Sequence, residues 1–189
     1  MTSQPLLSVQ DLKTYFYTEE GTIKAVDGLS LTVEKGETVC VVGESGCGKS
    51  VTALSILRLI PDPPGKIVSG SILFDGQDIM KLEKEDLRRL RGRQISMVFQ
   101  EPMTALNPVF TIGDQITEAI LVHKKMRHHQ AEQTAIELLS LVGVPSPAER
   151  SRHDPHPLTG GLRHRVMIAM ALACRPALMI ADEPTTEVG

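Results

Sequence analysis

Hydrophobic and polar residues alternate over the first third of the chain, a pattern typical of strands with one buried face. Residues 6–17 read LLSVQDLKTYFY and residues 19–37 read EEGTIKAVDGLSLTVEKGE, with glycines at positions 21, 28 and 36. β-Branched residues between such glycines favour strands joined by turns. We therefore predict a small antiparallel β region at the N-terminus.

Two continuous apolar runs predict strands that are buried on both faces. The first, TVCVV at 38–42, lies between Gly36 and Gly43, and the second is ALMIAD at 177–182. A helix from about Lys49 to Ile60 should follow the first run and end at the sequence PDPPG, because proline cannot continue a helix.

The middle of the chain gives a hairpin signal and then helical patterns. Asp75-Gly76 predicts a tight turn within SILFDGQDI, followed by a helix in KLEKEDLRRLR and a strand in QISMVFQ. Apolar residues then recur at helical spacing in IGDQITEAILVHKKM and HHQAEQTAIELLSLVG. We predict one domain over residues 1–189, made of a β region and core (1–100), a helical subdomain (101–160) and a final helix and strand (161–189).

Composition removes several function classes. The net charge of −3 and a pI near 6.1 disfavour nucleic acid as a ligand, because proteins that bind it usually carry a basic surface. Three scattered cysteines suit a reducing cytoplasm better than a disulfide framework. No apolar run approaches the roughly 20 residues of a membrane span, so we expect any membrane association to be peripheral.

Residues 43–50 read Gly-Glu-Ser-Gly-Cys-Gly-Lys-Ser, which is the complete P-loop pattern between a predicted strand and a predicted helix. Glycines let successive backbone N–H groups and the positive end of the helix face a phosphate. Lys49 can reach the outer phosphates of ATP, and the Ser50 hydroxyl can bind Mg²⁺. The predicted nucleotide-binding residues here are Gly43, Glu44, Ser45, Gly46, Cys47, Gly48, Lys49, Ser50 and Val51.

Four apolar residues, Leu178 to Ala181, precede Asp182 and Glu183, so both carboxylates should emerge at the end of a buried strand. A P-loop enzyme needs one carboxylate to hold Mg²⁺ and a group to position the attacking water. We assign Asp182 to Mg²⁺ and Glu183 to the water as general base.

Three further segments resemble the ATPases of ABC transporters. LTGGLRHR (158–165) resembles their signature motif, ADEP (181–184) their acidic motif, and Gln100 ends a strand as their Q-loop glutamine does. VFQEPMTALNPVFTIGDQI and RVMIAMALACRPALMIADEPTT are similar to the branch that imports dipeptides, oligopeptides or nickel. The resemblance implies an α/β fold with a RecA-like P-loop NTPase core, an N-terminal antiparallel β region and an inserted helical subdomain.

The resemblance also implies a machine that works as a pair. ATP would lie between two ATPase subunits. The signature residues of this chain would contact the ATP bound to the partner subunit; these residues are Leu158, Thr159, Gly160 and Gly161. Gln100 would sense Mg²⁺ and couple to transmembrane permease subunits, whose cytoplasmic loops the helical subdomain would dock. The chain would then lie peripherally on the cytoplasmic face of the inner membrane. An aromatic residue in the β region stacks on adenine in this family, and Phe16 occupies the matching place. Tyr15 and Tyr17, on the opposite face of the predicted strand, are second choices, and plain packing of Phe16 is the alternative.

The sequence departs from the family pattern after Thr186, where it reads Glu-Val-Gly. The resemblance leads us to expect that C-terminal core strands are missing and that turnover by this chain alone is weak. The leading hypothesis is the ATP-hydrolysing subunit of a peptide importer. A nickel importer and a truncated, non-catalytic nucleotide-binding module remain alternatives.

Overall fold

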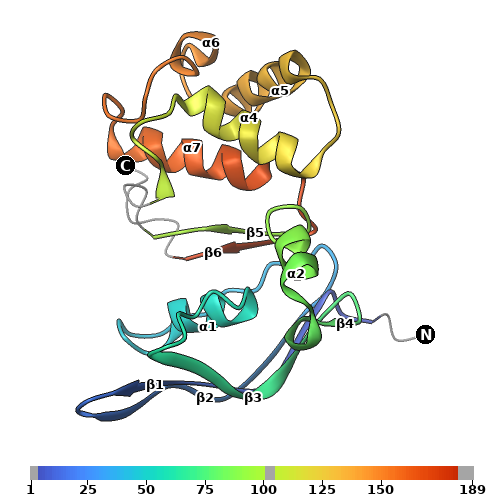
Figure 1. Cartoon of the computed structure of the whole chain (residues 1–189), viewed down its shortest axis with the longest axis vertical. Helices are drawn as coiled ribbons and strands as arrows, with labels where there is room; N and C mark the ends of the chain where they lie inside the picture. The colour runs from blue at the N-terminus through green and yellow to red at the C-terminus, as the bar shows by residue number, and fades with distance from the viewer. Residues whose placement is uncertain (1–3, 101–104, 183–189) are drawn as a thin grey trace. The chain divides into compact units, whose positions relative to one another are not determined.

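A four-stranded antiparallel sheet begins the computed structural model, which describes residues 4–100 and 105–182 (Figure 1). Its strand order is β2-β1-β3-β4. The strands are β1 (Leu7–Thr18), β2 (Gly21–Val33), β3 (Gly65–Phe74) and β4 (Gln77–Asp78). The predicted antiparallel β region is therefore confirmed, with the turn at Asp75-Gly76 joining β3 to β4 through two residues of positive φ.

The chain divides into two compact units, Met1–Leu87 and Arg88–Gly189. The first contains the sheet, α1 (Lys49–Ile56) and the short helix η1 (Ile79–Lys81), and α2 (Lys84–Leu90) spans the boundary. Buried side chains of β1 and β3, among them Leu12 and Ile72, form the core of this first unit with Ala53 and Ile56 of α1.

The second unit pairs two parallel strands with a group of helices. Strands β5 (Ile95–Val98) and β6 (Leu178–Ala181) run parallel in register. The helices are α4 (Ile112–His123), α5 (His128–Leu141), α6 (Pro147–Arg150) and α7 (Gly160–Leu172). A single hydrophobic cluster joins Ile116 and Ile120 of α4, Leu139 of α5 and Val166 of α7. The predicted helices and both predicted strands of this part of the chain are confirmed.

The predicted strand at 38–42 is wrong. These residues form no strand, and the side chains of Val39, Val41 and Val42 are 42%, 51% and 86% exposed. No described strand pairs with this segment. An apolar run becomes a buried strand only where neighbouring strands form hydrogen bonds with its N–H and C=O groups. The sequence pattern alone does not show where those neighbouring strands lie.

Two further expectations need correction. Helix α1 ends at Ile56 rather than at Ile60, because Arg58 adopts a left-handed conformation (φ 52°) and donates hydrogen bonds to the carbonyl oxygens of Ile79 and Leu82. Strand β6 is only half buried, since β5 is its sole described neighbour and Met179 is 46% exposed. Asp182 therefore follows a strand with one exposed face.

Candidate functional site

The P-loop forms a tight turn that leads directly into α1. Its backbone N–H of Cys47 donates to the carbonyl oxygen of Glu44 at 3.3 Å, and Gly46 and Gly48 have φ values of 81° and 92°. Residues with a side chain rarely adopt such angles. Gly48 is the N-cap of α1, so the loop leads directly to the N-terminus of the helix, where backbone N–H groups and the helix dipole favour an anion.

Gly48 also lies against β2. A Cβ atom at this position would overlap the carbonyl oxygen of Ala25, which is a backbone atom that cannot turn aside. Glycine at position 48 therefore satisfies two conditions together, the left-handed backbone angle and the close approach of the loop to the sheet. The P-loop pattern predicted the glycine, whereas its contact with Ala25 is visible only in the tertiary structure.

The ammonium group of Lys49 lies within the loop itself. Its Nζ donates to the carbonyl oxygens of Gly43 at 2.9 Å and Glu44 at 2.8 Å, and lies 3.9 Å from Sγ of Cys47. These contacts hold a positive charge beside the backbone turn. A phosphate bound in the turn would be within reach of this charge and of the α1 N-terminus.

A buried hydrogen bond fixes α1 on the sheet. The hydroxyl oxygens of Thr14 on β1 and Ser55 on α1 are 2.8 Å apart, and both residues are fully buried. Ser55 also donates to the carbonyl oxygen of Val51 at 2.6 Å. The sequence analysis missed this pair, although a threonine at an inward position of an alternating strand was a usable signal.

Phe16 lies on β1 opposite Gly65 of β3. Its ring occupies the space that a side chain at position 65 would fill, next to Ile60. Phe16 is half buried, so one part of the ring packs in the sheet while another part faces solvent. Stacking on adenine and plain packing both remain compatible with this arrangement.

Tyr15, the neighbour of Phe16, has a separate set of partners. Its hydroxyl donates to Asp27 at 2.6 Å, and the ammonium of Lys24 lies 5.4 Å from its ring centre. The hydrogen bond to Asp27, with smaller contributions from desolvation and nearby negative charge, raises the pKa of Tyr15 to about 12. The same hydrogen bond lowers the pKa of Asp27.

Gln100 and Asp182 leave the same edge of the parallel sheet in the second unit. Val98 pairs with Ala181, and the backbone N–H of Asp182 donates to the carbonyl oxygen of Val98 at 3.0 Å. The two polar residues therefore follow the carboxyl ends of adjacent parallel strands, where α/β proteins place their ligands. Glu183 lies outside the described residues.

The segment that resembles a signature motif opens α7. Thr159 is the N-cap, and its hydroxyl accepts a hydrogen bond from the N–H of Leu162 at 3.4 Å. Leu158 is 4% exposed and packs in the core, whereas Thr159 and Gly160 are exposed. Arg163 holds the preceding loop through hydrogen bonds to the carbonyl oxygens of Pro155 and His156. The helix end is thus anchored while its first turn faces outward.

The structure groups the predicted residues in two sets. The P-loop residues and Phe16 belong to the first unit, and Gln100, the signature residues and Asp182 belong to the second. Mg²⁺ prefers oxygen ligands, and each set contains a candidate ligand, the hydroxyl of Ser50 in the first and the carboxylate of Asp182 in the second. Among residues 4–100 and 105–182, no helix is long and apolar enough to cross a membrane.

The comparisons with known proteins agree with this geometry. Residues 26–186 match the family described as ABC transporter. The dipeptide transport ATP-binding protein DppD of Bacillus subtilis is 52% identical over 183 residues, covering 97% of this chain and 55% of that protein. The oligopeptide transport ATP-binding protein AppD of the same organism is 52% identical over 181 residues, covering 96% and 55%. The chain therefore spans about half the length of these relatives.

Solved structures show the same fold. The dimeric ATP-binding cassette MJ0796, in a post-hydrolysis state with ADP and phosphate, superposes with a TM-score of 0.85 at 27% identity, covering 95% of this chain and 75% of that one. The cassette cbiO1 of Clostridium perfringens, part of the transporter complex cbiONQ, gives a TM-score of 0.77 at 25% identity, covering 99% and 68%.

Proposed function

Since the chain belongs to the ABC transporter family, we propose that it is the ATP-binding and ATP-hydrolysing part of an importer of dipeptides or oligopeptides. The observation that carries this proposal is the P-loop turn, which holds the Lys49 ammonium beside the N-terminus of α1. Relatives about 50% identical over nearly the whole chain, whose names describe dipeptide and oligopeptide transport, support the choice of cargo.

We assign binding of the nucleotide to residues of the first unit. Backbone N–H groups of residues 43–51 surround the phosphates, and Lys49 neutralises the outer ones. Phe16 stacks on the adenine. Mg²⁺, when bound, neutralises charge on the phosphates, and we assign its protein ligands to the hydroxyl of Ser50, the carboxylate of Asp182 and the side chain of Gln100.

We assign hydrolysis to Glu183, which accepts a proton from the attacking water as general base. Leu158, Thr159, Gly160 and Gly161 act on the nucleotide of a second ATPase subunit. The exposed start of α7 supports this role, because outward-facing N–H groups at a helix N-terminus attract a γ-phosphate. The dimeric state of the similar cassette MJ0796 supports a paired arrangement.

We assign coupling to Gln100 and the helical subdomain, which contact the cytoplasmic loops of permease subunits. Two exposed apolar side chains, Val109 at 83% and Phe110 at 53%, precede α4 and support a contact surface there. This role would place the chain peripherally on the cytoplasmic face of the inner membrane. Nickel is the alternative cargo, and a non-catalytic nucleotide-binding module is the alternative activity.

The test compares the chain with Lys49→Ala and Glu183→Gln variants, first for ATP binding and then for hydrolysis with the permease and partner ATPase. We expect Lys49→Ala to weaken ATP binding at least about tenfold, because it removes a charge-assisted contact. Glu183→Gln should retain binding but lose hydrolysis. Binding without hydrolysis by the unchanged chain in the complete complex would favour the non-catalytic module, and import of nickel but not peptide would favour the other cargo.

A further inference from the structure

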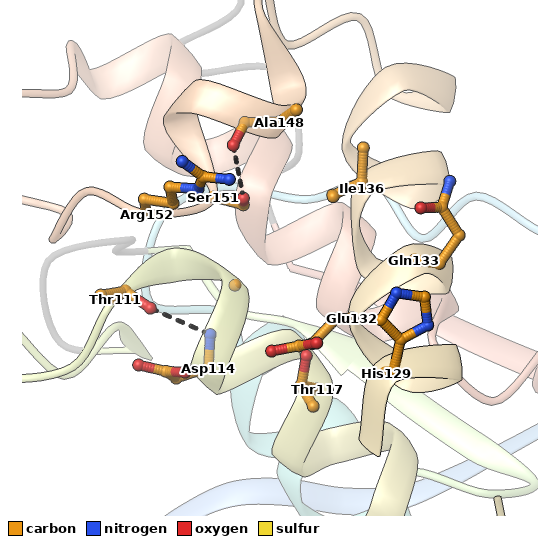
Figure 2. A pocket seen from close by; sticks show the side chains of 11 residues that line it. Thr111, Asp114, Thr117, His129, Glu132, Gln133, Ile136, Ala148, Ser151 and Arg152 are labelled. Carbon is orange, nitrogen blue, oxygen red and sulfur yellow. Dashed lines mark hydrogen bonds between the residues drawn. The ribbon is translucent and has the colours of Figure 1, made fainter. Parts of the chain in front are cut away.

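A pocket of about 460 Å³ lies among α4, α5 and the end of α6, entirely within the second unit (Figure 2). Pockets of this size hold small organic ligands. None of the residues assigned above to nucleotide binding or hydrolysis lines it. Its lining combines polar and charged side chains with two apolar side chains, Ile136 and Ala148.

Thr117 on α4 is the first sign of a ligand. It is 2% exposed, it lines the pocket, and its hydroxyl has no hydrogen-bond partner in the described part of the chain. A buried hydroxyl without a partner is unfavourable. The neighbouring buried residue Gln115, by contrast, makes several hydrogen bonds, among them one to the carbonyl oxygen of Phe110 at 3.0 Å. The hydroxyl oxygen has almost no accessible surface, so a polar ligand in the pocket would give Thr117 its missing partner after a small movement of this side chain.

Exposed charged side chains of both signs line the same pocket. Glu132 on α5 and Arg152 after α6 lie on different walls, as Figure 2 shows, and Asp114 on α4 adds a second carboxylate. Within the described residues, neither Arg152 nor Asp114 forms an ion pair, and Glu132 pairs only with the exposed His128 at 3.4 Å. A ligand that carries both a positive and a negative group could form an ion pair with Glu132 on one wall and with Arg152 on the other.

The walls are held in place before any ligand binds. The backbone N–H of Gly113 donates to the carbonyl oxygen of Ser151 at 2.7 Å, and that of Ile112 donates to the carbonyl oxygen of His153 at 2.9 Å. Thr111 caps α4 through the N–H of Asp114 at 3.1 Å. These bonds fix the start of α4 to the segment that carries Arg152, and a preformed pocket loses less entropy when it binds.

We propose that this pocket binds a zwitterion, either a free amino acid or a short peptide. The ligand's ammonium group contacts Glu132 and Asp114, its carboxylate contacts Arg152, and one of its polar groups hydrogen-bonds to Thr117. The choice of a peptide rests on the proposed function, because an importer releases peptides on the side where this unit lies. Binding itself requires neither ATP nor a permease.

Isothermal titration of the 189-residue chain with dialanine tests the proposal. N-acetyl-dialanine and dialanine amide are the comparison ligands, since each lacks one of the two charges. We expect saturable binding of dialanine that weakens at least about tenfold when either end is blocked, because a charge-assisted contact is lost. Glu132→Gln and Arg152→Gln should weaken binding of dialanine similarly.

Matched variants separate the pocket from general charge effects. Glu137→Gln on α5 and Arg150→Gln on α6 remove the same charges outside the pocket lining and should leave the affinity unchanged. Thr117→Val should weaken binding, whereas Thr117→Ser, which keeps the hydroxyl, should retain it. Circular dichroism of every variant establishes that it is folded.

Several outcomes would overturn the proposal. These are the absence of saturable binding, equal affinity for free and blocked dialanine, and equal losses in the control variants. Loss of permease association in Glu132→Gln and Arg152→Gln without any dialanine binding would assign the pocket to the permease instead. An ATP titration of the same sample distinguishes the two hypotheses, because a chain that binds ATP but not dialanine contradicts only this inference.

Discussion

The hydroxyl groups of Thr14 on β1 and Ser55 on α1 form a fully buried hydrogen bond of 2.8 Å, which joins the first sheet to the helix that follows the P-loop. Helix α1 presents the loop to a nucleotide only if the helix itself is fixed. A buried polar pair is well suited to this task, because it is stable in one geometry and costly when half of it is removed.

Removing the Ser55 hydroxyl should lower the free energy of unfolding more than removing the Thr14 hydroxyl. Ser55→Ala leaves the Thr14 hydroxyl buried without its partner and should lower the free energy of unfolding by about 1–3 kcal/mol. Thr14→Val should cost less, because Ser55 still donates to the carbonyl oxygen of Val51. Urea denaturation measures both changes, and Thr32→Val at an exposed position of β2 is the control. Equal costs for Ser55→Ala and Thr14→Val would contradict the predicted asymmetry, and costs no larger than that of the control would show that the buried hydrogen bond does not stabilise the fold.

Gly48→Ala should reduce ATP affinity more than the same substitution at Gly36. Both Gly48 (φ 92°) and Gly36 (φ 79°) have left-handed backbones, but only a Cβ at position 48 would meet backbone, the carbonyl oxygen of Ala25. We expect Gly48→Ala to reduce ATP affinity at least about tenfold, and Gly36→Ala to leave it nearly unchanged. Fluorescence titration with a labelled ATP analogue measures both. Similar losses in the two variants would point to backbone angle rather than steric overlap.

The hydrogen bond between Tyr15 and Asp27 predicts a distinctive alkaline titration. The chain has two tyrosines, so Tyr17→Phe isolates the absorbance of Tyr15 at the tyrosinate wavelength. Tyr15 should ionise near its raised pKa of about 12, and Asp27→Asn should return this pKa toward its ordinary value.

The sign of the linked stability change follows from these shifts. Because the pKa of Tyr15 is raised on folding, its contribution to stability is complete below the unfolded pKa of 10.0 and is lost as pH rises toward about 12. Because the pKa of Asp27 is lowered, its contribution is present above 3.8 and is lost as pH falls. A Tyr15 titration that Asp27→Asn leaves unchanged would contradict both statements.

The three cysteines should react with a thiol reagent at different rates. Cys40 and Cys47 are exposed, whereas Cys174 is buried, and burial raises its pKa. A raised pKa lowers the thiolate fraction, which is the reactive form. We expect two fast thiols and one slow thiol at pH 8, counted with a chromogenic disulfide. ATP should slow only the reaction of Cys47, and protection of Cys40 alone would place the nucleotide elsewhere.

Local signals in the sequence determined the turn at Asp75-Gly76, the P-loop glycines and the helices of the second unit. Each of these depends on residues close together in the chain, such as a pair of turn residues or apolar positions at helical spacing. Strands β5 and β6 were also predicted, from the apolar runs that precede Gln100 and Asp182, but their parallel pairing was not. The nucleotide site was therefore recognisable before any tertiary contact was known.

Tertiary structure alone decided which apolar runs became strands and how the P-loop was fixed. Residues 38–42 have the composition of a strand but no described strand beside them, and β6 has one neighbour, so half of it is exposed. Helix α1 ends early, at Ile56, and Arg58 beyond it donates hydrogen bonds to carbonyl groups more than 20 residues away, those of Ile79 and Leu82. Strand pairing, burial and such long-range hydrogen bonds require partners that are distant in sequence, and a local pattern does not identify those partners.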